Sequence, residues 1–273
     1  MRPEFDFQVA EIDEIARMFA RNGCALLRNF CPEQTLQDLH ARLDELHGIV
    51  KSVHLSPDQL QEHGVSQPQE YLFSDKHKAL MARVFKDVPY KDLRGNVTRR
   101  MLGGWQSPLA AHVDAFFHPM GFTVNFWVPL QPCGVTTPSL GVVCAPYEEI
   151  IRFTGFQSTP FWEDREAAPG ENFAHFRPEM RQYYYGKGRQ GEGRAEIDVF
   201  FGDRVWKPVF EYGDAMMLSN WTLHFTHANP GMSGERRNIE MRFHSQATPD
   251  QVVEKLRLSL AQDVAASAAA SGA

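Results

Sequence analysis

The chain has 273 residues, of which 43% are hydrophobic and 23% charged, and its net charge is −6 with a pI of about 6.0. These proportions are typical of a globular protein that is long enough to bury its own core. The acidic balance argues against a dedicated nucleic-acid binder, and the sequence contains no apolar run of membrane-spanning length.

The first residues and the cysteines bear on the cellular compartment. The stretch MRPEFDFQVAEIDE is acidic and lacks the basic and apolar regions of a signal peptide. The four cysteines form no C-x-x-C pair, which argues against a zinc ribbon or a thioredoxin-type site. We therefore expect a cytoplasmic protein with free thiols. The sequence does not indicate an oligomeric state.

The N-terminal part, residues 1–94, is expected to be mostly helical. Apolar residues recur at helical spacing over 7–21 and stop before Asn22-Gly23, a typical helix end. A short strand over 24–30 follows. Further helices are expected over 33–49 and 69–86.

After about residue 95, short β-rich runs stand between glycines and prolines. The clearest is 121–130, in which Thr123, Asn125 and Trp127 face one side of the strand. The opposite side carries Phe122, Val124, Phe126 and Val128. Other candidate strands are 140–145, 196–201, 205–211, 215–219 and 236–244. Several short strands in succession predict a sandwich or a barrel.

We expect one domain over residues 1–273, with its β-rich core at 95–246 and a C-terminal helix and frayed tail at 247–273. The stretch 151–195 interrupts this core with aromatic, charged and glycine residues. A segment this long inside a β domain is typical of a lid or binding loop, and a disordered insertion is the alternative. As a lid, it offers a substrate the aromatic side chains Trp162, Phe173, Tyr183, Tyr184 and Tyr185.

The first chemical signal is His112-Val113-Asp114, which precedes the clearest strand. In an extended segment residues i and i+2 project to the same side, so the imidazole and the carboxylate can hold adjacent corners of one metal ion. The motif alone is weak, because a chain with 11 histidines contains about one such triplet by chance. A surface turn is the alternative interpretation.

Two histidines and an arginine pair complete the pattern. His224 and His227 are three residues apart and face opposite sides of a strand, so only one of them can join the first pair. Two histidines and one carboxylate leave three open positions on a metal ion, which is the arrangement of non-haem iron(II) oxygenases. A chelating 2-oxo acid takes two of these positions and O₂ the third. Arg236-Arg237 opens the last candidate strand, where an arginine suits the distal carboxylate of that cosubstrate.

Together these segments resemble the phytanoyl-CoA dioxygenase family of iron(II)/2-oxoglutarate-dependent oxygenases. The likeness covers about residues 95–246, with a weaker match over 22–30. Its motifs are H-V-D-A at 112–115, N-F-W-V-P-L at 125–130, Cys133-Gly134, the strand that ends at Pro146, and Gly213-Asp214 through His224 to Asn229. Pro146 is followed by Tyr-Glu-Glu instead of the Gly-Ser-His usual in the family.

The resemblance implies a mainly β fold, namely a double-stranded β-helix (jelly-roll, cupin-like) core with N-terminal helices packed on it. It implies that His112, Asp114 and His224 bind the iron, since the spacing to Asn229 selects His224 over His227.

The resemblance also implies a binding site for 2-oxoglutarate. Thr226 falls where the family often has a hydroxyl beside the cosubstrate carboxylate, and Asn125 is a further candidate contact. Arg236 is the expected anchor. Arg237 is its rival, because the spacing from His224 looks one residue longer than is common in the family.

We therefore expect an Fe(II)- and 2-oxoglutarate-dependent dioxygenase. It would hydroxylate, or otherwise oxidise, an unactivated carbon of a small-molecule substrate and release succinate and CO₂. Asp114 argues against radical halogenation, because halogenases of related fold replace this carboxylate with a small residue. Two alternatives stay open: a metal-dependent cupin-like isomerase or hydrolase that does not use O₂, and a non-enzymatic jelly-roll binding protein. The sequence does not select a substrate.

Overall fold

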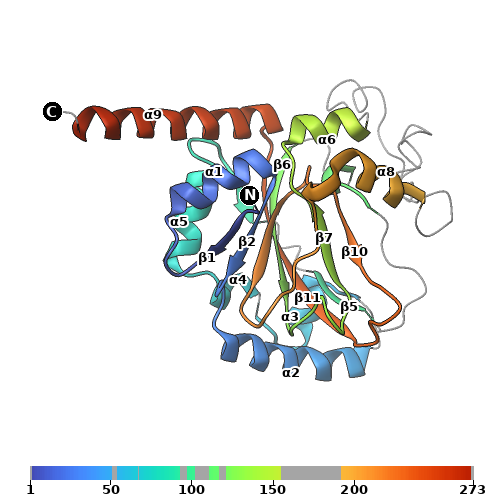
Figure 1. The fold of residues 1–273 in the computed structure, drawn as a ribbon. Helices are drawn as coiled ribbons and strands as arrows, with labels where there is room; N and C mark the ends of the chain where they lie inside the picture. Colours follow the sequence, from blue (N-terminus) through green and yellow to red (C-terminus); the bar gives the residue numbers. More distant parts are fainter. Residues whose placement is uncertain are drawn as a thin grey trace, which may run out of the picture.

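The computed structural model describes residues 2–50, 54–66, 68–92, 97–101, 111–116, 121–154 and 192–271. Two β-sheets face each other, and helices cover the outside of the larger sheet (Figure 1). The larger sheet has eight strands in the order β1-β2-β9-β6-β11-β5-β3, with β4 paired to β11. The smaller sheet has the order β10-β7-β8. This architecture confirms the expected double-stranded β-helix core with N-terminal helices.

The elements have the following bounds. The strands are β1 (Glu4–Asp6), β2 (Cys24–Arg28), β3 (His54–Leu55), β4 (Lys91–Asp92), β5 (Val97–Met101), β6 (Phe122–Pro129), β7 (Ser139–Val143), β8 (Val205–Trp206), β9 (Ala215–Ser219), β10 (His224–His227) and β11 (Arg236–Ser245). The helices are α1 (Ile12–Asn22), α2 (Glu33–Val50), α3 (Pro57–Glu62), α4 (Pro68–Leu72), α5 (Asp75–Val84), α6 (Tyr147–Thr154), α8 (Glu192–Phe201) and α9 (Lys255–Ser271). Short helical turns are η1 (Asp114–Phe116), η3 (Gly202–Arg204) and η4 (Asp250–Glu254).

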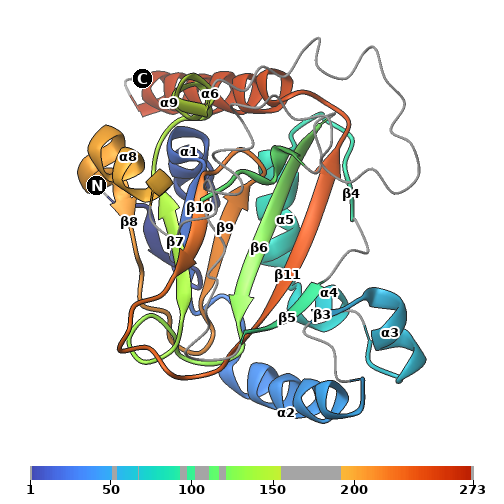
Figure 2. The same cartoon turned by 90° about the vertical axis from the view of Figure 1, so that its right-hand side faces the viewer.

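The outer face of the larger sheet packs on helices. Figures 1 and 2 show α1 and α5 against this face and α2 across one end of the strands. The main hydrophobic cluster joins buried side chains of α1, α2 and α5 to one side of β6, β9 and β11. Burying a large apolar side chain contributes about 1.5–3 kcal/mol, so this face contributes much of the folding free energy.

The antiparallel register of β6 and β11 sorts their side chains onto two faces. Val124 pairs with Phe243, and both belong to the apolar cluster under the helices. Asn125 pairs with Arg242, one residue along each strand, and therefore faces the smaller sheet. Trp127 lies on this inner face too, since it belongs to a second cluster with β7 and β8 residues. The predicted alternation along 121–130 is thus confirmed.

Two predicted elements and the predicted overall class differ from the structure. Residues 196–201 are helical within α8 instead of a strand, because Ile197 and Phe201 are buried four residues apart while Val199 is exposed. The predicted helix 69–86 is divided into α4 and α5, since Ser74 is the N-cap of α5 and forms a capping box with His77. Among the described residues helix outweighs strand, so "mainly β" was an overstatement.

Smaller differences lie at element ends. The first helix begins at Ile12, because Asp6 accepts a hydrogen bond from the Gln8 amide and holds the preceding residues in a turn. Within 205–211 only Val205–Trp206 is a strand, and Pro208 has no amide proton to extend it. Helix α9 includes 264–271, which the sequence indicated as part of a frayed tail.

None of the helices in the described part of the chain is both long and apolar enough to cross a membrane. The aromatic residues proposed to line a lid fall within 155–191, outside the described residues.

Candidate metal centre

Two histidines that are far apart in sequence lie side by side at the end of β10. His112 and His224 exchange both backbone N–H···O=C hydrogen bonds, each 2.9 Å long, in an isolated antiparallel bridge. Residues paired in this way project their side chains to the same face. The two imidazole rings accordingly lie 4.3 Å apart, centroid to centroid.

Asp114 completes the group from the first residue of η1. Its Oδ1 lies 3.6 Å from Nε2 of His112 and 3.7 Å from Nε2 of His224. The next amide, that of Ala115, donates a 2.6 Å hydrogen bond to the Asn220 carbonyl. This bond ties the turn that carries the carboxylate to the loop between β9 and β10.

That loop also fixes the second histidine. The Thr222 hydroxyl accepts a 3.0 Å hydrogen bond from the Ser219 amide and donates to the Gly23 carbonyl, which closes the turn. Nδ1 of His224 lies 2.9 Å from the Thr222 carbonyl oxygen. Since a carbonyl only accepts, Nδ1 carries the proton, and Nε2 keeps the lone pair that a metal ion requires.

The three side chains fit one metal ion. Donor atoms that lie about 2.1 Å from the same ion are ~3.0 Å apart at a right angle and ~3.6 Å apart at 120°, close to the separations from Asp114 Oδ1. Each of the three residues is buried, which suits a closed centre. Within the described ranges, His112, Asp114 and His224 are the only group of three or more His, Cys, Asp or Glu side chains close enough to share an ion.

The structure places the candidate cosubstrate residues on the same inner surface. Thr226 shares a face of β10 with His224 and pairs with Leu140 of β7. Arg236, only 2% exposed, donates from Nη1 to the Ser139 carbonyl over 3.1 Å. Its guanidinium lies over the Trp127 ring, 5.3 Å from the centroid.

The spacing between Arg236 and the candidate metal ligands would suit a chelated dicarboxylate. Ser139, which Arg236 contacts, is three residues along β7 from Val142, the partner of His224. Three residues of a strand span ~10 Å, about the reach of a five-carbon dicarboxylate that is bound to a metal ion at one end. The buried Oδ1 atoms of Asn125 and Asn238 on this surface have no hydrogen-bond partner among the described residues. Unsatisfied buried amides are uncommon and indicate room for a polar ligand or water.

The two rival residues have other positions. Arg237 faces the opposite side of β11, where it forms ion pairs with Asp44 of α2 and with Glu235. Its Nη1 also lies 3.0 Å from Nε2 of His40. His227 ends β10 and is not part of the metal-binding group. Arg237 thus links the sheet to α2, and Arg236 alone of the adjacent pair faces the interior.

The structure adds two residues that the sequence argument did not single out. Glu240 and Arg242 lie on the inner face of β11 and form a close ion pair. Arg242 Nη2 also lies 3.8 Å from Asp114 Oδ2. Burial alone lowers the pKa of Arg242, but the negative charges of Glu240 and Asp114 outweigh it and raise that pKa. The sequence signal for these two residues was a polar side chain at every second position from Arg236 to His244.

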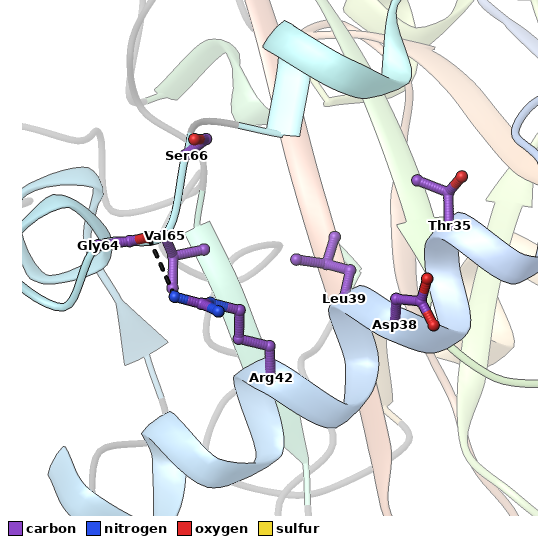
Figure 3. A pocket seen from close by; sticks show the side chains of 7 residues that line it. All are labelled: Thr35, Asp38, Leu39, Arg42, Gly64, Val65 and Ser66. Atoms are coloured by element: carbon purple, nitrogen blue, oxygen red, sulfur yellow. Dashed lines mark hydrogen bonds between the residues drawn. The ribbon is translucent and has the colours of Figure 1, made fainter.

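A groove of about 410 Å³ lies elsewhere, between α2 and the turn after α3 (Figure 3). Its lining is Thr35, Asp38, Leu39, Arg42, Gly64, Val65 and Ser66. Arg42 donates to the Gly64 carbonyl across it over 3.2 Å. None of the candidate metal-binding side chains lines this groove, so we assign it no role in the chemistry.

Solved structures show the same fold. SnoK, a non-heme alpha ketoglutarate dependent carbocyclase from nogalamycin biosynthesis, has a TM-score of 0.53 at 13% identity, over 89% of this chain and 87% of its own. EvdO2 from Micromonospora carbonacea var. aurantiaca, complexed with 2-oxoglutarate, has a TM-score of 0.52 at 12% identity, over 87% and 91%. The epimerase SnoN, in complex with Fe³⁺, alpha ketoglutarate and nogalamycin RO, has a TM-score of 0.50 at 13% identity, over 86% and 83%.

No protein-family model matches the sequence, and no curated protein matches it. At identities of 12–13% the structural likeness establishes the fold alone. The chain has the fold of these non-heme alpha-ketoglutarate-dependent enzymes.

Proposed function

We propose that this protein is an Fe(II)- and 2-oxoglutarate-dependent oxygenase that oxidises an unactivated carbon of a small molecule. The observation that carries the proposal is the inward-facing group of His112, Asp114 and His224, with both Nε2 atoms directed at one carboxylate oxygen. Its donor set, two imidazoles and one carboxylate, suits iron(II) and leaves positions open for other ligands.

Hydrogen bonds within the protein orient the two histidines of this group. The Thr222 carbonyl keeps His224 in the tautomer that binds a metal through Nε2. The exchanged backbone hydrogen bonds between His112 and His224 fix the spacing of the two rings before any ion arrives. Preorganised ligands lose little entropy on binding, which favours a tightly held metal ion.

We assign the cosubstrate to the inner surface next to these ligands. Arg236 would pair with the distal carboxylate of 2-oxoglutarate, and the Thr226 hydroxyl and Asn125 amide would hydrogen-bond the same molecule. Bound together, iron(II), 2-oxoglutarate and O₂ supply an oxidant strong enough to break an unactivated C–H bond, with succinate and CO₂ as co-products. Trp127 and its apolar neighbours would keep water from the cosubstrate.

The proposal extends to the reaction at the substrate carbon. Similar structures include a carbocyclase and an epimerase, so the fold serves several fates of an oxidised carbon. We propose hydroxylation or a related oxidation, and not halogenation, because Asp114 fills the coordination position that a halide needs. The SnoN complex contains nogalamycin RO, which supports a small molecule as the substrate here.

Anaerobic absorption spectroscopy tests the proposal. Protein with Fe(II) and 2-oxoglutarate should develop a weak visible charge-transfer band. The band should be lost in Asp114→Ala and in His224→Ala. His227→Ala is the matched control, since it removes an imidazole from the same strand but not from the metal-binding group, and it should retain the band.

The alternatives give different results. A metal enzyme that does not use O₂ would bind the ion without a 2-oxoglutarate-dependent band, and a binding protein would lack a tight metal site. No band in the wild type, together with no 2-oxoglutarate-dependent O₂ uptake, would contradict the proposal.

A further inference from the structure

Arg242 stands beside the candidate metal ligand Asp114, and Glu240 forms an ion pair with Arg242. The two residues follow each other at alternate positions of β11 and so share its inner face. Arg242 Nη2 contacts Glu240 Oε2 closely and lies 3.8 Å from Asp114 Oδ2. A separation of 3.8 Å is an ion-pair distance and exceeds a hydrogen bond.

The two oxygens of the Asp114 carboxylate have different neighbours. Oδ1 is the oxygen nearest to both histidine Nε2 atoms, at 3.6 and 3.7 Å. Oδ2 is the oxygen that faces the guanidinium. A cation beside Oδ2 favours the rotamer in which only Oδ1 reaches the ion, because turning the carboxylate would take Oδ2 away from the positive charge.

Glu240 limits how strongly the arginine acts. Its carboxylate holds the guanidinium more closely than Asp114 does. Without Glu240, the cation would move onto Asp114 and compete with the metal ion for the same carboxylate. Asn238 restrains Glu240 in turn, since its Nδ2 lies 3.5 Å from Glu240 Oε1.

The pair leaves the charge of the site unchanged. Glu240 contributes one negative charge and Arg242 one positive charge. The net charge of the three residues therefore equals that of the Asp114 carboxylate alone. The pair therefore acts through geometry and not through added attraction. Groups that orient metal ligands in this way typically change metal affinity by about 10–100-fold.

We propose that Glu240 and Arg242 form an orienting clamp, in which Arg242 holds Oδ2 of Asp114 so that the carboxylate binds the metal through Oδ1 alone. Both are positioning residues, and this inference rests on the proposed function. One-oxygen binding by Asp114 matters because a second carboxylate oxygen on the ion would occupy a position that 2-oxoglutarate or O₂ requires.

Titration with Co(II) measures the clamp without turnover. Co(II) binds the same donor types and has visible absorption bands that depend on coordination number. The charge-matched double exchange Glu240→Gln/Arg242→Gln should weaken Co(II) binding about 10-fold and change the band intensity, since Asp114 is then free to bind through both oxygens. Glu240→Gln alone should weaken binding further, because the released guanidinium pairs with Asp114.

Two further variants separate positioning from folding. Arg242→Lys keeps the cation but lacks the planar fork, so its Co(II) affinity should fall between the wild type and the double variant. Arg237→Gln is the matched control, a buried and ion-paired arginine on the outer face of the same strand. It should lower the thermal midpoint without changing Co(II) affinity or spectrum.

The results test the orienting clamp and the proposed function separately. A double variant that binds Co(II) with wild-type affinity and an unchanged spectrum would overturn the clamp while leaving the metal centre intact. A wild-type protein that binds no Co(II), Fe(II) or Zn(II) would overturn the proposed function and the clamp together.

Discussion

The two faces of β6 and β11 belong to the same strands and have opposite compositions. The outer face of β11 carries Ile239, Met241 and Phe243, all within the main apolar cluster. The inner face carries Arg236, Asn238, Glu240, Arg242 and His244 at the alternate positions. One strand thus contributes to the stability of the protein with one set of side chains and to its candidate chemistry with the other.

The separation of the two faces explains how the candidate site accommodates buried charge. Ionised groups removed from water cost several kcal/mol each unless they are paired. Here the outer face supplies apolar burial, while on the inner face Glu240 pairs with Arg242. Because side chains alternate along each strand, one face can bury apolar side chains while the other holds charged ones. It predicts that variants on the outer face change stability and that variants on the inner face change ligand binding.

Among the variants proposed for the outer face, Phe126→Ala should lower the unfolding free energy most. Phe126 is fully buried, stacks on Phe30 with ring centroids 5.0 Å apart, and contacts Phe73 and Phe243 edge-on. Loss of such a side chain costs about 3–5 kcal/mol of unfolding free energy. Denaturant unfolding measures this. A loss below about 1 kcal/mol would show that the face is not the main source of stability.

His77 makes the same region sensitive to acid. It is 2% exposed among the rings of Phe7, Phe30 and Phe73. Burial lowers its pKa from 6.5 to about 4, although the Phe30 carbonyl acts in the opposite direction. The unfolded chain therefore takes up a proton at pH values where the folded protein does not. Unfolding free energy should fall by up to about 3 kcal/mol as the pH drops from 6.5 to 4.

His77→Gln provides the comparison for that acid effect. This variant should be less stable at neutral pH, because it loses the ring contacts and the hydrogen bond to Phe30. Its unfolding free energy should nevertheless depend less steeply on pH between 6.5 and 4. Parallel pH curves for the two proteins would exclude His77 as the source of the acid sensitivity.

Thr226→Val is the smallest of the three changes and acts on the inner face. The exchange keeps the branched shape and removes the hydroxyl proposed to bind 2-oxoglutarate. A lost hydrogen bond to a charged group is worth about 1.5–3 kcal/mol, so the dissociation constant of 2-oxoglutarate should rise at least about 10-fold. Equilibrium titration of the Fe(II) protein measures it. An unchanged constant would remove Thr226 from the cosubstrate site.

Much of the fold was predictable because the hydrophobic periodicity agreed with the positions of glycine and proline. The strand at 122–129 alternated cleanly, and the helix that begins at Glu33 carried an unbroken leucine stripe. Residues 196–201 were mistaken for a strand, since a short apolar run fits either structure until its burial is known. Ser74 within the predicted helix 69–86 was a readable sign of a new helix start.

The grouping of the candidate site residues was predictable where local spacing determined it. His112 and Asp114 stand two residues apart, and the structure brings His224 to them. The contact between Arg242 and Asp114 was not predictable, because it depends on how β11 and η1 approach in space. The choice between Arg236 and Arg237 needed the strand's orientation, which alternation alone leaves open by one residue.

That adjacent pair offers the most direct test of the division between the two faces. Arg236→Gln and Arg237→Gln are chemically identical exchanges at neighbouring positions of β11. We predict that Arg236→Gln weakens 2-oxoglutarate binding to the anaerobic Fe(II) protein by at least about 10-fold. Arg237→Gln should leave this affinity within about 2-fold but reduce the unfolding free energy by about 1–2 kcal/mol, since it loses its ion pairs with Asp44 and Glu235. Weaker 2-oxoglutarate binding in Arg237→Gln, with wild-type affinity in Arg236→Gln, would contradict the assignment of cosubstrate binding to the inner face.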